Sequence, residues 1–546
     1  MIIPLFLFAK YNLLKTGVSI AFIFLLFCLT HCAKRGTPTG GPLDSIPPVL
    51  VNASPKQNTT FFDENKIQLT FDEYITLKNI NKQLIVSPPL ERDQYSVSPQ
   101  TGAAKKITIE LLDSLLANTT YTFNFGNSIA DFNETNPYPF FSYTFSTGSV
   151  IDSLGLRGHI TDALENETKR FISIQMYPVD SVLPDSTIYT QKPFYAASSL
   201  DTTVFQMKNL KPGRYEIIAL QDVSGNYFYD QGIDKIGFRD EPITLPQDSI
   251  IDFRLFKEPA PFAWTRPFFI NERHIGIGFY GNPEGQTFEQ IAPVTNSFEA
   301  LITRDRETDT LHYWFKGGAN LDSLKFRYIQ KDTLATTTVS FNNPVKDSLV
   351  ITKIAGTTLS LADVFKLRAS LPIVAMDSTL VSVQNIDSLA IPFQMVLDEN
   401  YDRIALDFDL EPNDTYRIEL LPNALRDFWG QSHDTLRFKA ATKKPEDLGT
   451  IYLKLDYSYE TPFILQLLKK DRVVREYTTR LESEVYDFKY LSPGKYTFRF
   501  IKDKNGNGKW DPGNYRNKIQ PEEVIYFLSD LEIRANWDLN ESFQVQ

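Results

Sequence analysis

Cysteine is almost absent from this chain of 546 residues: Cys28 and Cys32 are the only two, and both lie near the N-terminus. If the segment before Cys32 is removed, one cysteine remains and no internal disulfide can form. The body of the chain therefore lacks the thiols that a cysteine zinc site or a cysteine nucleophile needs.

Positive charge and histidine are also scarce. The chain has 56 Lys and Arg against 67 Asp and Glu, which gives a net charge of −11. It lacks the positive field that a phosphate backbone requires, so we expect no nucleic-acid binding. Four histidines follow Cys32 without a His-Glu-x-x-His pattern, and we expect them to be structural: His159, His274, His312 and His433.

One apolar run indicates targeting. Val18 to Leu29 carries no charge, follows two lysines and is too short to cross a bilayer as a helix, which needs about 20 residues. It ends in Leu29-Thr30-His31-Cys32, which resembles the lipobox of bacterial lipoproteins, although His31 replaces the usual small residue. The resemblance implies a signal peptide over residues 1–31 and lipidation of Cys32. A plain signal peptide or an uncleaved anchor is the alternative.

The segment after Cys32 predicts a tether. Residues 33–48 (AKRGTPTGGPLDSIPP) are rich in Gly, Pro and Thr and poor in apolar side chains. Such a segment behaves as a flexible linker with a reach of roughly 20–25 Å. We therefore expect residues 32–47 to connect a lipid anchor to the body of the protein.

The body of the chain has the alternating pattern of β-strands. Apolar and polar residues alternate at 67–71, 121–125, 143–145, 452–455 and 496–500, and Pro-Gly turns separate such segments. Only residues 361–371 suggest a short helix. The length predicts about four or five domains, so the expected fold is all-β, a tandem array of β-sandwich domains.

An internal repeat is the strongest signal in the sequence. LKPGRYEIIALQDVSGNYFYDQG from Leu210 matches LSPGKYTFRFIKDKNGNGKWDPG from Leu491 at an offset of 281 residues without gaps, and the match reaches Glu241 and Glu522. A weaker repeat precedes each copy: Asn118-Thr119-Thr120-Tyr121 leads to Asp131, and Asn413-Asp414-Thr415-Tyr416 leads to Asp427. The predicted domains are residues 48–148, 149–258, 259–355, 356–444 and 445–546.

These modules resemble known families. The first, with Ile46-Pro47-Pro48, Leu69 to Glu73, Thr120-Tyr121 and Phe145 to Gly148, resembles the surface-layer type of bacterial Ig-like domain. Residues 356–444 are a divergent second copy. The Leu-x-Pro-Gly-x-Tyr modules resemble the prealbumin-like (transthyretin-like, CNA-B-type) sandwich, and residues 259–355 match neither family. With the tether at Gly36 to Pro42, the whole chain resembles Ig-like-domain outer-membrane lipoproteins of Bacteroidota.

That resemblance implies a place and partners. It implies attachment to the outer membrane through the lipid on Cys32, with an outer-membrane β-barrel and other lipoproteins of an assembly or export machine as partners. Ala33 does not suggest retention in the inner membrane, whereas Lys34-Arg35 lacks the acidic signal of many surface lipoproteins of this phylum. We expect the cell surface rather than the periplasmic face.

The loop after each Leu-x-Pro-Gly-x-Tyr strand is a candidate calcium site. Calcium takes six to eight oxygen ligands, and alternating Asp and Asn side chains provide them. Gly508 stands where an EF-hand-like loop turns sharply, and Glu522 could fold back in place of the missing glutamate at the twelfth position. The candidate ligands of this loop are Asp503, Asn505, Asn507, the carbonyl of Lys509, Asp511 and Glu522.

The first copy is the weaker candidate, because Tyr227 stands where the glycine should be. Its candidate ligands are Asp222, Ser224, Asn226, Asp230 and Glu241. The alternative for both copies is a hairpin held by Asx turns, which needs no metal. Calcium is the only cofactor that the sequence suggests, and it would stiffen the loop rather than catalyse.

Other motifs have structural explanations. Gly276 to Gly281 fits G-x-G-x-x-G, but a turn follows it instead of a helix, so we expect a strand and hairpin. Ser128 lacks a nucleophile elbow, and Asp131 and Asp427 fit Asx turns. The aromatic clusters at residues 138–141 and 264–269 fit core or inter-domain packing, with a contact surface as the alternative.

The expected function is a non-enzymatic scaffold at the outer membrane. A binding module for glycans or host surfaces is the alternative, and a hydrolase in the middle segment is the third candidate, because carboxylate pairs leave no spacing signature.

Overall fold

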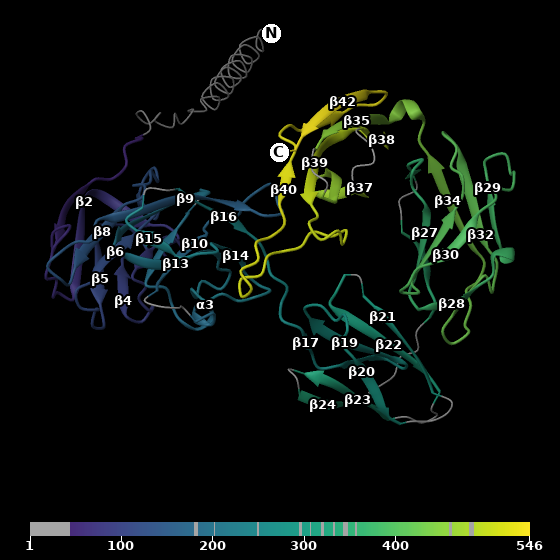
Figure 1. The fold of residues 1–546 in the computed structure, drawn as a ribbon, viewed down its shortest axis with the longest axis horizontal. Helices are drawn as coiled ribbons and strands as arrows, with labels where there is room; N and C mark the ends of the chain where they lie inside the picture. Colours follow the sequence, from purple (N-terminus) through teal and green to yellow (C-terminus); the bar gives the residue numbers. More distant parts are fainter. Residues whose placement is uncertain are drawn as a thin grey trace, which may run out of the picture.

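The computed structural model describes residues 44–179, 184–200, 202–247, 250–293, 298–305, 307–317, 322–330, 333–341, 348–354, 358–457, 461–479 and 485–545. Nearly all regular structure in these residues is β-strand, and the strands form five successive sandwiches, each with two main sheets (Figure 1). The predicted fold class, a tandem array of β-sandwiches, is confirmed. Each sandwich buries its own apolar cluster between its sheets.

The first and fourth sandwiches contain the weaker repeat. The first has the sheets β1-β2-β5-β4, with β7 beside β2, and β3-β6-β8. Its elements are β1 (Leu50–Ser54), β2 (Lys66–Leu77), α2 (Ile80–Gln83), β3 (Ile85–Ser87), β4 (Tyr95–Ser98), β5 (Ala104–Leu111), β6 (Thr120–Asn124), β7 (Ile129–Asp131) and β8 (Ser142–Ser146).

The fourth sandwich has the sheets β25-β27-β31-β30, β26-β34-β32-β29 and β28-β33. Its elements are β25 (Ile351–Lys353), β26 (Thr358–Leu359), β27 (Phe365–Ala369), β28 (Ile373–Met376), η1 (Ser378–Leu380), β29 (Val381–Gln384), β30 (Gln394–Leu397), β31 (Arg403–Asp407), β32 (Thr415–Leu420), β33 (Leu425–Asp427) and β34 (Leu436–Thr442). The weaker repeat corresponds to β6-β7-β8 and β32-β33-β34.

Two expectations for this region need correction. The helix expected within residues 361–371 is wrong, because Phe365, Leu367 and Ala369 are buried in alternation with exposed residues and form β27. The boundary expected between residues 355 and 356 lies outside the described residues. However, β25 pairs with β27 and therefore already belongs to the fourth sandwich.

The second and fifth sandwiches contain the strong repeat. The second has the sheets β12-β9-β16 and β11-β10-β13-β14, with β15 beside β13. Its elements are β9 (Leu154–Asp162), β10 (Ser173–Pro178), α3 (Thr187–Thr190), β11 (Tyr195–Ser198), β12 (Val204–Leu210), β13 (Gly213–Gln221), β14 (Lys235–Phe238), β15 (Ile243–Leu245) and β16 (Ile251–Leu255).

The fifth sandwich has the sheets β38-β35-β42 and β37-β36-β39-β40, with β41 beside β39. Its elements are η2 (Pro445–Asp447), β35 (Gly449–Asp456), β36 (Phe463–Lys469), β37 (Arg472–Thr479), β38 (Val485–Leu491), β39 (Gly494–Lys502), β40 (Val524–Tyr526), β41 (Leu531–Ile533) and β42 (Asp538–Gln544). Strands β38 and β39 begin and end 281 residues after β12 and β13, and in both sandwiches the last strand lies parallel to the first.

The third sandwich lies between the two repeated units. It has the sheets β17-β19-β22-β21, with β18 beside β19, and β20-β23-β24. Its elements are β17 (Ala263–Trp264), β18 (Phe268–Asn271), β19 (His274–Tyr280), β20 (Phe288–Ala292), β21 (Glu299–Arg304), β22 (Thr310–Lys316), β23 (Ser323–Gln330) and β24 (Thr333–Ser340).

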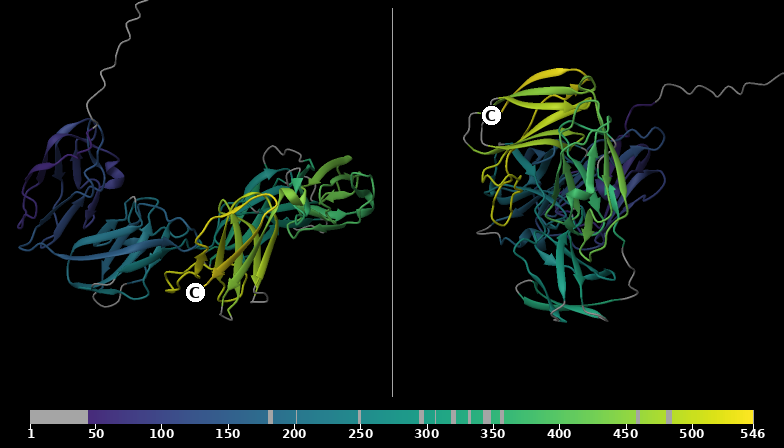
Figure 2. Two further views of the ribbon diagram at one scale, coloured as in Figure 1. Left: turned by 90° about the horizontal axis from the view of Figure 1, so that it is seen from above. Right: turned by 90° about the vertical axis from the view of Figure 1, so that its right-hand side faces the viewer.

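The chain doubles back on itself. Figure 1 shows the third sandwich below and the fourth at the right, while a long loop of the fifth extends toward the second near β14. Figure 2 shows the same arrangement from two further sides, with the fifth sandwich beside the second. Side-chain contacts join the fifth sandwich to the second, so the chain forms a closed path.

Candidate functional site

The two candidate calcium loops lie at equivalent points of the repeat. The first loop, residues 222–234, joins β13 to β14, and the second loop, residues 503–522, joins β39 to β40. Judged by the strand pairing on either side, the second loop is seven residues longer. The gapless sequence match therefore loses its register inside this loop.

Each loop begins with an aspartate that accepts three backbone N–H groups. Asp503 Oδ1 accepts from Gly506 at 2.8 Å and from Asn507 at 3.1 Å, and its Oδ2 accepts from Gly508 at 2.9 Å. Asp222 accepts the three equivalent N–H groups of the first loop. Both loops therefore have the Asx-turn conformation that the sequence offered as the alternative to metal binding.

A second carboxylate closes each loop from its far end. Glu522 accepts the N–H of Lys504 at 2.7 Å and that of Asp511 at 3.0 Å. In the first loop the equivalent two N–H groups are bound by Asp234, both at 2.9 Å. Glu241, which the gapless match paired with Glu522, does not take this position and is exposed after β14. Burial raises the pKa of Asp234 and that of Glu522.

The remaining candidate ligands also bond to one another. Asn505 and Asn507 donate their amide N–H groups to Asp511 Oδ2 at 2.5 and 2.9 Å, and Lys509 donates its backbone N–H to Asn507 Oδ1 at 2.8 Å. The first loop repeats the pattern with Ser224, Asn226 and Asp230. In the part of the chain that the structure describes, no three Asp, Glu, His or Cys side chains gather closely enough to hold a metal ion. Calcium binding stays a prediction.

The two loops differ in the residue that occupies one position of positive φ. Gly508 has a φ of +73°, and the equivalent residue of the first loop is Tyr227 at +66°. Glycine adopts this conformation freely, whereas a residue with a side chain pays about 1–2 kcal/mol for it. The first loop thus places a tyrosine ring where the backbone alone would favour glycine.

The extra length of the second loop lies in residues 512–521, which we call the docking segment. Tyr515 is 2% exposed and packs edge-on against Phe238 of the second sandwich, with the ring centroids 5.4 Å apart. Its backbone N–H donates to Glu258 and its hydroxyl to Glu216 at 3.4 Å. The docking segment therefore enters an apolar cluster of the second sandwich that also includes Ile218 and Leu220.

Charged groups complete this junction. Lys518 Nζ lies 2.7 Å from Glu216 Oε1 and 3.9 Å above the centre of the Tyr515 ring. Gln520 donates its side-chain amide to the carbonyl of Phe238 at 3.1 Å and to Asp240 at 2.8 Å. Because Glu216 is only 5% exposed, the docking segment supplies the cation that this buried carboxylate needs.

The rest of the fifth sandwich adds two further bonds. Arg499 and Tyr526 both donate to the carbonyl of Leu164, at 3.3 and 2.8 Å. Sequence reasoning missed this junction, since it joins residues more than 250 positions apart. The signal available was the presence of Trp510 and Tyr515 in an otherwise polar loop.

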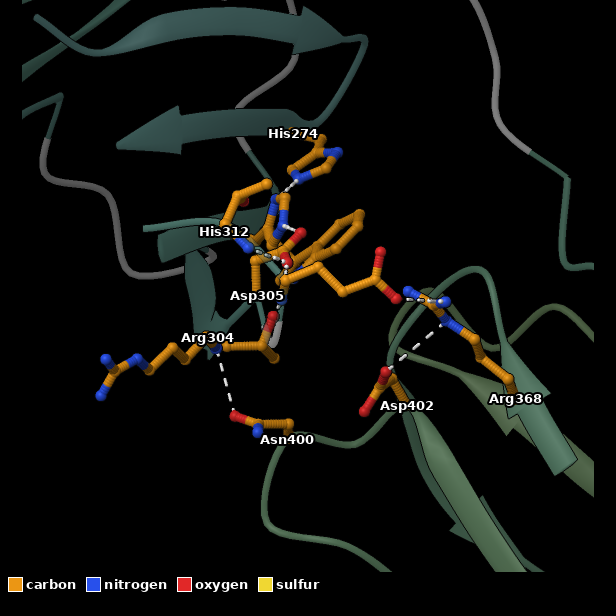
Figure 3. A network of polar contacts seen from close by, with 11 residues as sticks. His274, Arg304, Asp305, His312, Arg368, Asn400 and Asp402 are labelled. Carbon is orange, nitrogen blue, oxygen red and sulfur yellow. Dashed lines mark hydrogen bonds and ion pairs between the residues drawn. The ribbon is translucent and has the colours of Figure 1, made fainter. Parts of the chain in front are cut away.

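A second junction joins the third and fourth sandwiches (Figure 3). His274 Nε2 lies 2.7 Å from His312 Nδ1, and His312 Nε2 lies 3.2 Å from Asp305 Oδ2. His274 is stacked on Trp314 with the ring centroids 3.6 Å apart. Burial, with a smaller contribution from His312, lowers the pKa of His274 to about 3. No motif in the sequence indicated this contact, and the structure brings the two histidines together with Asp305 in a hydrogen-bonded row.

Further contacts cross this junction beside the histidines. Arg304 donates its backbone N–H to Asn400 at 3.2 Å, and Arg368 pairs with Glu307 at 3.5 Å (Figure 3). The indole N–H of Trp429 donates to the carbonyl of Phe315 at 3.0 Å. Trp314, Leu371 and Phe428 form the apolar cluster between the two sandwiches.

The other motifs have structural roles. Gly276 and Gly278 lie on β19 and Gly281 in the turn that follows it, and a Cβ on Gly276 would meet the Phe268 ring at 2.4 Å. Ser128 is fully buried. Asp131 and Asp427 are buried and accept backbone N–H groups of the turns that follow them, as expected for Asx turns.

The aromatic clusters are divided between core and surface. Phe141 and Trp264 are buried, whereas Phe140 and Phe268 are 56% and 50% exposed. His159 pairs with Asp252 at the surface, and His433 bonds to the backbone of Leu425 and Asp434. These two histidines have the structural roles expected of them.

The targeting segment is a separate matter. The signal peptide at residues 1–31, Cys32 and most of the tether lie outside the described residues. Within the described ranges, no helix has both the length and the apolar character needed to span a membrane. Lipidation of Cys32 and the membrane location remain predictions.

Comparison with known proteins supports the Ig-like assignment. Residues 44–147, the first sandwich, match the bacterial Ig-like domain family, which confirms that part of the resemblance. No curated protein matches the chain. Similar solved structures include domains A168–A170 of titin (10% identity, 45% of this chain and 94% of that chain, TM-score 0.14).

Two bacterial structures have the same level of similarity. They are the S-layer protein rSbsC(31-844) (9% identity, 84% of this chain and 65% of that chain, TM-score 0.14) and the major pilin subunit of Bacillus cereus (9% identity, 72% and 99%, TM-score 0.14). With TM-scores this low, we draw no conclusion on function from these similarities.

Proposed function

We propose that this protein is a non-catalytic scaffold, anchored to the outer membrane by a lipid on Cys32 and facing the cell surface. The observation that carries the proposal is the closed path of the chain: the docking segment of the fifth sandwich is buried in the second. A chain whose distant modules are joined by buried contacts holds partner-binding surfaces at fixed positions, which is what a scaffold requires.

The partners we propose are an outer-membrane β-barrel and companion lipoproteins. This rests on the resemblance of the sequence to outer-membrane lipoproteins of Bacteroidota. The first sandwich, which follows the tether, exposes several large apolar side chains that suit protein contacts: Ile46, Val51, Phe61, Leu112 and Leu116.

A pull-down in mild detergent tests the proposal. The tagged, lipidated protein is purified from its own membranes, and the co-purifying proteins are identified by mass spectrometry. A stoichiometric β-barrel is the expected result. Recovery of the protein alone, with its lipid intact, would overturn the scaffold role. A Cys32→Ala variant should be missing from the outer membrane, and its unchanged retention there would contradict lipid anchoring.

A docking-segment variant connects the function to the structure. Tyr515→Ala with Lys518→Ala should release the fifth sandwich from the second and reduce recovery of the partners. Asn517→Ala is the matched control, because Asn517 is exposed in the same segment. If the double variant opens the chain but keeps every partner, the closed path is not what the partners recognise.

A further inference from the structure

The junction between the first and second sandwiches contains a large cleft. Its volume is about 970 Å³, and it lies between the segment around β3 and β4 on one side and the first loop on the other. Lys192 of the second sandwich pairs with Glu91 of the first at 2.5 Å, and Ala196 donates its N–H to Ser87 at 3.2 Å. These bonds hold the two walls of the cleft together.

Two large side chains at this cleft have an unusual backbone conformation. Phe171 and Tyr227 line it with φ values of +61° and +66°. A neighbouring pocket of about 320 Å³ is lined by Phe140 and Leu200, with φ values of +56° and +54°. Large side chains rarely adopt positive φ, and such strain is concentrated at functional sites. The second loop has glycine in place of Tyr227, so the ring is not needed to form the loop.

The lining of the cleft combines aromatic faces with cations. Tyr95 and Tyr227 present rings, and Phe171 is 43% exposed. Arg92 and Arg170 line the same cleft, and neither has an ion pair within the residues that the structure describes. Of the carboxylates in the lining, Glu91 pairs with Lys192 and Asp222 accepts three backbone N–H groups, which leaves Asp93 opposite the two arginines. The two guanidinium groups therefore favour an anionic ligand, because guanidinium binds carboxylates and sulfates in a bidentate manner.

The form of the cleft favours a saccharide over a peptide. An extended peptide commonly binds by adding a strand to a free sheet edge. Here the edge strands β3 and β11 face each other across the bond between Ser87 and Ala196, and the third edge strand at the cleft, β4, contributes only Tyr95 to the lining. Recognition is therefore left to side chains: ring faces for the apolar faces of sugar rings, and hydroxyl and amide groups such as those of Asn81 and Ser173 for sugar hydroxyls.

We propose that this cleft binds an acidic oligosaccharide, with Tyr95 and Tyr227 contacting sugar rings and Arg92 and Arg170 binding the acidic groups. The site goes beyond the scaffold role and does not depend on it, because every residue involved belongs to the first two sandwiches. It also gives a reason for the tyrosine at a position where the repeat otherwise has glycine.

Calorimetric titration of the full chain in detergent micelles tests the site. The probes are tetragalacturonic acid, maltotetraose as the neutral match and a pentaglutamate peptide as the acidic peptide. We expect heat of binding with tetragalacturonic acid only. Absence of binding to that acid, or equal binding of the neutral sugar, would overturn the proposal. Binding of pentaglutamate alone would assign the cleft to peptides and overturn it as well.

Two variants locate the binding. Arg92→Ala with Arg170→Ala should weaken binding about tenfold or more, the usual effect of losing charged hydrogen bonds. Tyr227→Gly should also weaken it while keeping the backbone conformation, since glycine accepts positive φ. Matched controls are Arg157→Ala with Arg254→Ala on the other sheet of the second sandwich, and Tyr401→Gly, where φ is +61° in the fourth sandwich.

The outcome is decided by comparing these four proteins. Loss of binding in both cleft variants, with unchanged melting temperature and unchanged binding in both controls, supports the site. Binding that survives in both cleft variants, or that falls equally in the controls, would overturn it. A scaffold that keeps its partners but binds no saccharide would refute this site alone.

Discussion

The second and fifth sandwiches are two copies of one module that have acquired different contacts. Strands β12-β13 and β38-β39 agree to the residue, and both following loops are closed by a first aspartate and a returning carboxylate. The first loop faces a cleft between the first and second sandwiches. The second loop instead extends its docking segment into the second sandwich. The comparison shows that the two copies of the module share the same strands. They differ in loop length and in single side chains, and these differences determine which neighbouring sandwich each loop contacts.

The largest expected effect comes from removing the ring of Tyr515, which lies in the docking segment that the first loop lacks. Tyr515→Ala should destabilise the closed chain by about 3–5 kcal/mol, because it empties a buried aromatic site and removes the hydroxyl that donates to the buried Glu216. Calorimetry should then show an earlier transition, and limited proteolysis should cut the second loop faster. Asn517→Ala should behave as wild type. Equal protease resistance in all three proteins would contradict the docking.

Acid should weaken the junction of the third and fourth sandwiches more than that of the repeated copies. The pKa of His274 is lowered from 6.5 to about 3, so its neutral form stabilises the fold above pH 6.5, and this stability is lost as the pH falls toward 3. At pH 5 the loss is about 2 kcal/mol.

His274→Phe removes this titration and should flatten the dependence of stability on pH between 7 and 5, as measured by urea unfolding. His159→Ala is the control, because His159 lies at the surface beside Asp252. An unchanged pH dependence in the His274 variant would show that other groups control acid sensitivity.

Calcium binding by the second loop would distinguish the two loops by their effect on stability. If the second loop binds the ion as its residue pattern predicts, calcium at 100 times its dissociation constant should stabilise the fifth sandwich by about 2.7 kcal/mol. Asp503→Ala with Asp511→Ala should abolish the effect, and Glu241→Ala should leave it intact. No calcium-dependent heat or melting shift in wild type would reject calcium for both loops.

The smallest expected effect comes from substituting the positive-φ residue of each loop, Gly508 or Tyr227. Gly508→Ala should destabilise the fifth sandwich by about 1 kcal/mol, since alanine at a φ of +73° is strained. Tyr227→Gly should relieve similar strain in the first loop, offset by the loss of ring contacts. Lys509→Ala is the neighbouring control. Chemical denaturation measures all three, and a loss in Lys509→Ala equal to that of Gly508→Ala would contradict the backbone explanation.

The sequence predicted the parts of the fold that depend on local pattern. Alternating residues located β2, β6, β35 and β39, and the repeat located equivalent strands. The pattern misled at residues 361–371, where the alternation of Phe365, Leu367 and Ala369 should have outweighed the helix expectation. Local patterns report the environment of neighbouring residues, so they succeed where a strand is buried on one face.

The site depended on information that no local pattern contains. A gapless match assigned Glu241 to the place that Asp234 takes, because seven inserted residues shift the register before Glu522. The junctions at Tyr515 and at His274 join strands distant in sequence, and only the folded chain brings them together. An aromatic residue in a polar loop suggests that Tyr515 is buried against another part of the protein. The sequence does not show that Phe238 is the residue that it contacts.

The closed path of the chain is the central claim, and cysteine trapping tests it most directly. In a protein with Cys28→Ser and Cys32→Ser, Glu216→Cys and Lys518→Cys place one thiol on each side of the present ion pair, within reach of a short bis-maleimide cross-linker. The cross-linker should join the two thiols within one molecule, visible as a faster-migrating monomer. Absence of the intramolecular bond, with free thiols or cross-linked dimers instead, would contradict the closed chain.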